Sequence, residues 1–244
     1  MDRKRSTTDD VLAALESSPL PPGWGQARDA VVPLLARRRS LAPIGEPVSV
    51  DLDPGLRVGF AVDLGPVFLH VTGPLLRAWR VDVADLARQA IANLRARTQN
   101  LAPDSAVRAR VGLISLSVLQ APDGWASSLV LTPDLLPRWF GAGPRIFIAP
   151  GRNLLVAVPP ETDRRVAQWL RDELAAQLAD ALDVPPLLWD GARLRCDVPA
   201  GLPGVAPPTA PSRGKSGSPP RRWRVPLQGP RTTWYTPPPD RSVR

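Results

Sequence analysis

The distribution of proline limits what this chain can fold into more than any other feature. Of its 31 prolines, eleven lie in the last 44 of the 244 residues, in a stretch rich in glycine, serine and arginine and without isoleucine. Such a segment cannot bury enough apolar surface to offset the entropy lost on ordering. We therefore predict a disordered tail over 200–244, one folded domain over 26–199, and an amino-terminal extension with a short helix over 1–25.

Short apolar runs in the candidate domain predict strands. The residues Val48, Val50 and Leu52 alternate with polar ones, which is typical of a strand with one buried face. Other runs are rich in valine, isoleucine and leucine and are separated by turn residues such as the pair Asp190-Gly191. These further strands are predicted at 56–62, 67–71, 111–119, 145–149, 154–158, 187–190 and 192–197.

Other segments carry the 3.6-residue period of helices. After Asp82, a residue type suited to helix N-caps, apolar residues recur along one stripe that would face a core. A helix over 26–39 is predicted to end at Arg37, Arg38 and Arg39, where cations complement the exposed carbonyls. Thr72 and Pro74 suit the start of another helix. The predicted helical segments are 9–16, 26–39, 72–79, 82–94, 125–130, 133–140 and 162–182, the last being the longest.

The order of these elements indicates the fold class. Strands occur in adjacent pairs more often than they alternate one for one with helices. This order favours an α+β fold with a mixed, largely antiparallel sheet packed with helices. A doubly wound parallel fold is the alternative.

The composition excludes several classes of site. The single Cys196 excludes a disulfide framework and multi-cysteine metal sites, and the single His70 excludes sites that need two imidazoles. We predict no metal and no cofactor. No apolar run approaches the roughly 20 residues of a membrane span, and the residues after the basic start do not form a signal-peptide core. A cytoplasmic location is expected by default.

The net charge of +8 is concentrated in the predicted tail. Residues 201–244 carry eight basic groups and one acid, so the rest of the chain is nearly neutral. Arg221, Arg222, Trp223 and Arg224 combine cations with an aromatic ring, a composition suited to phosphates, to stacking on single strands or to lipid headgroups. Binding of nucleic acid or an anionic membrane through the tail is one hypothesis, and a solubilising extension is its alternative.

Weak candidates for a catalytic site are Asp123, Ser127 and Arg152, which lie at turns that border strands. An enzyme with an unrecognised carboxylate and arginine site is therefore a second hypothesis. The competing interpretation is structural: Asp123 suits a turn, and His70 is an isolated strand residue. Ser115 and Ser117 are interpreted as small strand residues.

Tryptophans support the hypothesis that we favour, a non-catalytic cytoplasmic domain that binds a protein partner and has a basic flexible tail. Core packing is the default role of such residues, but several in one exposed groove would mark a partner site. Oligomeric state is not predicted. Six tryptophans are spread over the candidate domain: Trp24, Trp79, Trp125, Trp139, Trp169 and Trp189.

A succession of short motifs spans 31–194. Its members are Leu56 to Leu64, Val71-Thr72, Trp79, Ala92-Asn93-Leu94 in the helix after Asp82, Asp123-Gly124, Ala126-Ser127-Ser128, Ala149-Pro150, Arg152 to Leu155, and Trp189-Asp190-Gly191. In order and spacing it resembles the bacterial YtpQ-like family, a domain of unknown function numbered 1444. The resemblance implies a soluble intracellular α/β protein of a family without an established activity. The tail departs from the family pattern.

Overall fold

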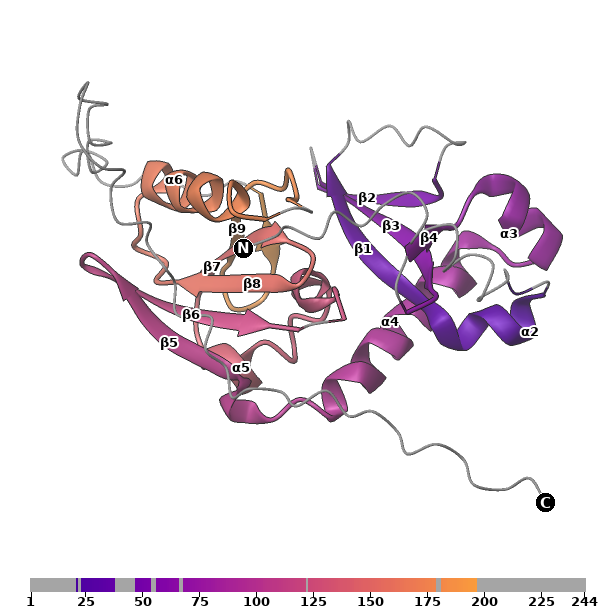
Figure 1. The fold of residues 1–244 in the computed structure, drawn as a ribbon, viewed down its shortest axis with the longest axis horizontal. Helices are drawn as coiled ribbons and strands as arrows, with labels where there is room; N and C mark the ends of the chain where they lie inside the picture. Colours follow the sequence, from indigo (N-terminus) through magenta and orange to yellow (C-terminus); the bar gives the residue numbers. More distant parts are fainter. Residues whose placement is uncertain are drawn as a thin grey trace, which may run out of the picture. The chain divides into compact units, whose positions relative to one another are not determined.

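A computed structural model of the chain describes residues 21, 23–37, 47–53, 56–65, 68–121, 123–178 and 181–196. The predicted helix over 9–16 and the predicted tail over 200–244 lie outside these residues. The described part is α+β and contains two antiparallel sheets with helices packed on them (Figure 1). The predicted fold class is thus confirmed.

The first sheet is built around β3 (Leu56–Asp63). Strand β1 (Val31–Arg37) pairs with one edge of β3. Strands β2 (Ser49–Asp53) and β4 (Phe68–His70) share the other edge, with β2 opposite the first half of β3 and β4 opposite the second half. The strands predicted around Val48, at 56–62 and at 67–71 are therefore confirmed, and both outer strands pair antiparallel with the same edge of β3.

The helix predicted over 26–39 is wrong. Only α2 (Trp24–Ala27) and the 3-10 turn η1 (Arg28–Ala30) are helical, and the chain then enters β1. Val31, Val32, Leu34 and Leu35 are all buried, so both faces of β1 are covered and the alternation that marks a strand is absent. Pro33 lies in an edge strand, where the missing N–H costs no ladder bond. Arg37 therefore ends a strand, while Arg38 and Arg39 lie outside the described residues.

Helices α3 (Gly73–Trp79) and α4 (Val83–Gln99) follow the first sheet. The side chain of Asp82 accepts a hydrogen bond from the Asp85 amide at 2.7 Å, so the predicted cap is confirmed. Thr72 precedes α3 but its side chain makes no capping bond. The buried stripe of α4 faces β1, and Asn93 donates to the carbonyls of Arg28 and Val31, which joins the helix to the start of that strand.

The second sheet has six strands in the order β10-β9-β7-β8-β6-β5, all paired antiparallel. A 3-10 turn, η2 (Pro103–Ser105), precedes it. The hairpin predicted at 145–149 and 154–158 is confirmed, and so is the pairing of the last two strands. The bounds are β5 (Ala106–Val111), β6 (Ile114–Gln120), β7 (Arg145–Gly151), β8 (Leu154–Val158), β9 (Leu187–Trp189) and β10 (Leu194–Arg195).

The single strand predicted over 111–119 is wrong. The segment begins at the end of β5, turns at Gly112 and Leu113, and continues as β6. Gly112 adopts φ +58°, a conformation that glycine adopts without steric cost. The turn was missed because the apolar residues on both sides of Gly112 form one continuous run.

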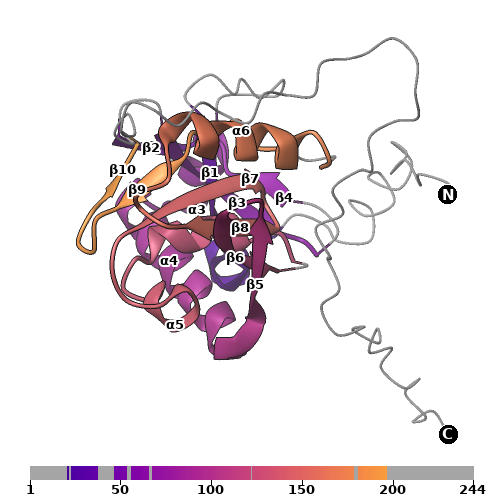
Figure 2. The ribbon, with the colours of Figure 1, turned by 90° about the vertical axis from the view of Figure 1, so that its left-hand side faces the viewer.

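Helices cover both faces of the second sheet, with α6 on one side and α5 on the other (Figure 2). Helix α6 (Arg164–Ala175) begins after Asp163, whose side chain accepts from the Arg165 amide. It is shorter than the predicted 162–182. The opposite face is covered by the 3-10 turn η3 (Ala126–Leu131) and by α5 (Pro137–Phe140), close to the predicted helical segments.

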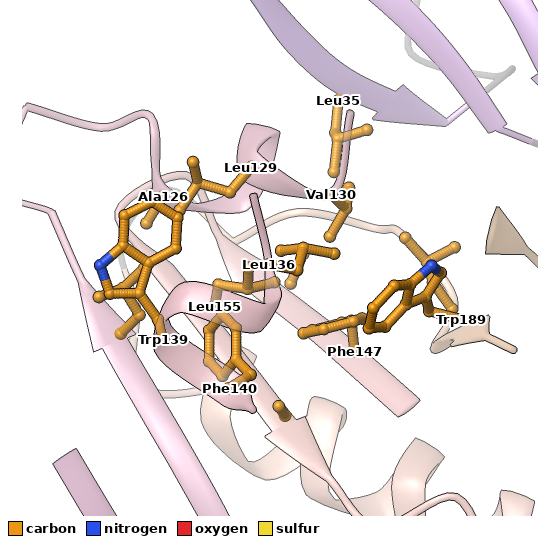
Figure 3. Packing of buried hydrophobic residues seen from close by; sticks show 14 of the residues in the cluster. Leu35, Ala126, Leu129, Val130, Leu136, Trp139, Phe140, Phe147, Leu155 and Trp189 are labelled. Atoms are coloured by element: carbon orange, nitrogen blue, oxygen red, sulfur yellow. The ribbon is translucent and has the colours of Figure 1, made fainter. Parts of the chain in front are cut away.

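The largest core cluster connects the two sheets. Leu35 of β1 and Leu56 of β3 belong to one cluster with Leu129 of η3 and Phe147 of β7. Figure 3 shows Leu35, Leu129 and Phe147 in this cluster. Four tryptophans are buried, and Trp24 and Trp169 are partly buried against the cores. The described tryptophans therefore form no exposed aromatic groove. The buried ones are Trp79, Trp125, Trp139 and Trp189.

Candidate functional site

Hydrogen bonds connect the segment from Ala121 to Ser128, the turn at Arg152 and Asn153, and strand β1 near the predicted catalytic residues. The Ser127 amide donates to the carbonyl of Arg152 at 3.1 Å, and the Ala121 amide donates to the carbonyl of Asn153 at 3.0 Å. The Ser128 hydroxyl, fully buried, donates to the carbonyl of Pro33 at 2.7 Å and so reaches β1. We call this set of contacts the turn junction.

Phe68 of β4 packs against the turn junction. The Arg152 guanidinium lies over its ring, with 5.6 Å from the guanidinium carbon to the ring centroid, a cation–π contact. Gly124 lies against the same ring: a Cβ at this position would be 3.0 Å from Cε2 of Phe68. Gly124 also has φ +73°. Glycine is thus required here by conformation and by space.

His70, the only histidine of the chain, lies on β4 next to the junction. Its side chain is half-buried, and its Nδ1 atom is buried with no hydrogen-bond partner among the described residues. Burial lowers the pKa of His70, and the positive charge of Arg152 lowers it further. The neutral imidazole is therefore the favoured form.

The structure brings Ser127 and Arg152 together through a backbone hydrogen bond that holds two turns in place, and it places Asp123 in the turn after Ala121. Ser127 is only 1% exposed, and its amide is used in the bond to Arg152. Asp123 is exposed beside Gly124. Sequence reasoning found these turns but missed Phe68 and the proximity of His70 to Arg152, because β4 is more than 50 positions away in the chain.

A second candidate site is an open hollow of about 700 Å³ on the six-stranded sheet. Strands β5, β6, β7 and β8 contribute to its lining, and Phe140 of α5 forms part of its wall. No acidic residue is among the described residues that line it. We call it the arginine hollow, after its polar residues Arg108, Arg110, Ser115, Ser117 and Arg145.

The strand register places the polar groups of the arginine hollow side by side. Arg108 lies opposite Ser117, and Arg110 lies opposite Ser115, on the β5–β6 pair. Residues two apart on a strand share a face, so both arginines point to the same side of the sheet. Arg145 is held by hydrogen bonds to the carbonyls of Phe140 and Pro144, at 3.4 and 3.2 Å.

Arg108 and Arg110 differ from many other arginines of the fold. Both are exposed, and within the part of the chain that the structure describes neither forms an ion pair. By contrast, Arg95 binds Asp134 through two hydrogen bonds of 2.8 Å, and Arg97 contacts Asp63. Other ion pairs are Arg57–Asp51 and Arg171–Asp183.

Sequence reasoning missed the arginine hollow. Ser115 and Ser117 were interpreted as small strand residues, and β5 was not predicted before Val111. The alternation of Arg108 and Arg110 with Val107, Ala109 and Val111 is the signal that could have revealed it.

Arg221, Arg222, Trp223 and Arg224 lie outside the described residues. Over the described ranges, no group of three or more histidine, cysteine, aspartate or glutamate side chains is arranged to hold a metal ion. None of the helices in those ranges is long and apolar enough to cross a membrane.

Comparison of the chain with protein-family models, with curated proteins and with solved structures found no match. The resemblance to the YtpQ-like family accordingly stays a prediction.

Proposed function

We propose that the protein is a non-catalytic, cytoplasmic protein-interaction domain whose arginine hollow binds an acidic partner. The observation that carries the proposal is the pair of exposed arginines, Arg108 and Arg110, which have no ion-pair partner among the described residues and lie in a hollow whose described lining contains no acidic residue. The basic tail adds electrostatic attraction to the same class of partner.

Charge complementarity supports an acidic ligand at this surface. Arg95, Arg97 and Arg171 are each paired with a carboxylate, whereas the arginine hollow gathers cations in one place that can be neutralised by binding. An arginine can hold a carboxylate through two parallel hydrogen bonds, and the two opposing serines add hydroxyl donors.

The enzyme hypothesis keeps one supporting observation, the backbone hydrogen bond that places Ser127 next to Arg152. A catalytic group must come within hydrogen-bond reach of a substrate. The burial of Ser127 and the position of the Arg152 guanidinium over Phe68 favour a structural role instead. We therefore rank it second, and tail-mediated binding of nucleic acid or membrane remains a separate alternative.

The proposal is tested with the full-length chain by quantitative pull-down from nuclease-treated native lysate. The test variant carries Arg108→Glu and Arg110→Glu. The control variant carries Arg77→Glu and Arg165→Glu, two exposed arginines on α3 and α6, so both proteins have the same net charge. A chain ending at Ala200 measures the contribution of the tail.

We expect a protein partner that the control variant retains and that the Arg108→Glu, Arg110→Glu variant loses. A partner retained equally by both variants would contradict binding at the arginine hollow. A partner lost only from the chain ending at Ala200 would instead support the tail hypothesis. Capture from a parallel untreated lysate that disappears after nuclease treatment would indicate nucleic acid as the ligand.

A further inference from the structure

We infer that the acidic partner binds as an extended strand added antiparallel to the outer edge of β5, which no described strand occupies, with acidic residues alternating with apolar ones. This inference rests on the proposed function and specifies the conformation of the partner. Addition of a strand to an open sheet edge is a recurring mode of peptide recognition.

Strand β5 is the sheet edge best suited to such addition. It has six residues, contains no proline and pairs in regular register with β6, and it lies at the outer end of the sheet (Figure 1). Among the other described edges, β1 contains Pro33, and β2 has an irregularity between Asp51 and Asp53. Strands β4 and β10 have only three and two residues.

The register of the hairpin decides which backbone groups are available. Val111 and Ile114 pair directly across the two-residue turn, so they exchange both of their backbone hydrogen bonds. The bonded pairs then alternate along the ladder. The N–H and C=O groups of Ala106, Arg108 and Arg110 consequently point away from β6, toward the free edge.

The two faces of β5 carry different side chains, so each face would contact a different kind of residue in an added strand. On the face of the arginine hollow, residues of an added strand opposite Arg108 and Arg110 would lie about 5 Å away, within reach of an ion pair. On the other face lie Val107, which is 48% exposed, and Ala109 and Val111, which pack against the core beneath α6. Apolar residues of the added strand would extend this core.

The same arginines oppose pairing of β5 with a second copy of itself. Arginines of two adjacent β5 strands would face one another on one surface, and like charges in cross-strand positions are destabilising. Charged residues on edge strands often serve only this protective role. The two roles can be told apart with an acidic strand. A binding edge would hold such a strand, whereas an edge that is only protective would not.

The experiment uses the full-length chain and a short capped peptide in which glutamate alternates with valine and threonine. In antiparallel addition, the residues opposite Arg108 and Arg110 direct their N–H groups toward β5. N-methylation of the glutamates therefore removes bonds to β5, whereas N-methylation of the intervening residues affects only the outer edge. Binding is measured by fluorescence anisotropy, with single-stranded oligothymidylate as a second ligand.

We expect N-methylation of the glutamates to weaken binding about 10-fold or more, and N-methylation of the other residues by less than about 3-fold. The Arg108→Glu, Arg110→Glu variant should lose about 10-fold or more in affinity, and the Arg77→Glu, Arg165→Glu control should not.

Three outcomes would overturn the inference. Equal effects of the two N-methylated peptides, with the charge-reversed variant still impaired, would show recognition of charge without strand addition and would leave the proposed function standing. No binding of the peptide would indicate a protective edge. Tighter, competing binding of oligothymidylate would indicate a nucleic-acid surface and would contradict the proposed function as well.

Discussion

The turn junction and the arginine hollow both contain arginine beside serine, yet they use these residues in opposite ways. At the junction, Arg152 lies over Phe68, and the nearby Ser128 hydroxyl is bonded to β1. At the hollow, Arg108 and Arg110 are exposed on a sheet edge, opposite Ser117 and Ser115. The first site connects the two sheets, whereas the second has charges available to a ligand.

This difference shows why residue type alone is a poor guide to function in this chain. A buried hydroxyl without a hydrogen bond is costly, so the bond to the Pro33 carbonyl fixes Ser128 at the junction. Exposed charges without partners contribute little to stability. Substitutions should therefore destabilise the fold at the junction and alter binding at the hollow.

The largest loss of stability is expected for Gly124→Ala. A left-handed conformation costs alanine about 1–2 kcal/mol, and the added Cβ must displace the Phe68 ring, for a total of about 2–3 kcal/mol. Gly65→Ala is the matched control, because Gly65 has φ +85° but no atom within 4 Å of the added Cβ. Denaturant unfolding of both variants measures the difference, and equal losses would show that the contact with Phe68 contributes nothing.

A smaller loss, about 1–2 kcal/mol, is expected for Ser128→Ala. The substitution removes the hydroxyl that donates to the Pro33 carbonyl and leaves this acceptor without its partner in a buried place. Ser115→Ala in the arginine hollow should change the free energy of unfolding by less than about 0.5 kcal/mol, since Ser115 is exposed. Similar values for the two variants would remove the energetic distinction between the sites.

The pH dependence of stability sharpens the comparison further. The pKa of His70 in the folded state lies below its ordinary value of 6.5, so the unfolded chain binds a proton more readily as the pH falls through this range. The free energy of unfolding should therefore decrease from pH 6.5 downward until the folded-state pKa has been passed. Because His70 is the only histidine, His70→Gln should remove this part of the slope in denaturant titrations. An unchanged slope would contradict a neutral, buried imidazole.

The sequence predicted the elements whose pattern is local. The Asp82 cap, the helix of Leu86, Ala90 and Leu94, and the hairpin at 145–158 depend on neighbouring residues and were found. Strand β1 was missed because its residues are buried on both faces by segments distant in the chain, so its apolar pattern resembled that of a helix.

The candidate sites follow the same rule. The turns at Asp123 and Arg152 carry local signals, and sequence reasoning named them. The contacts of these turns with Phe68 depend on tertiary neighbours that no local pattern specifies, and so does the lack of an ion pair between Arg108 and any described residue. The turn at Gly112 is the exception, because a glycine within an apolar run was an available signal that was overlooked.

The smallest effect on stability is expected at the arginine hollow itself. Replacing Arg108 and Arg110 together by glutamine removes no ion pair among the described residues and separates no buried contact, so the free energy of unfolding should change by less than about 0.5 kcal/mol. Arg95→Gln is the comparison, since it removes two hydrogen bonds to Asp134 and should cost about 0.2–1 kcal/mol. A loss above about 1 kcal/mol for the double variant would show that these arginines support the sheet. They would then belong with the groups of the turn junction, and their exposure would no longer indicate a binding surface.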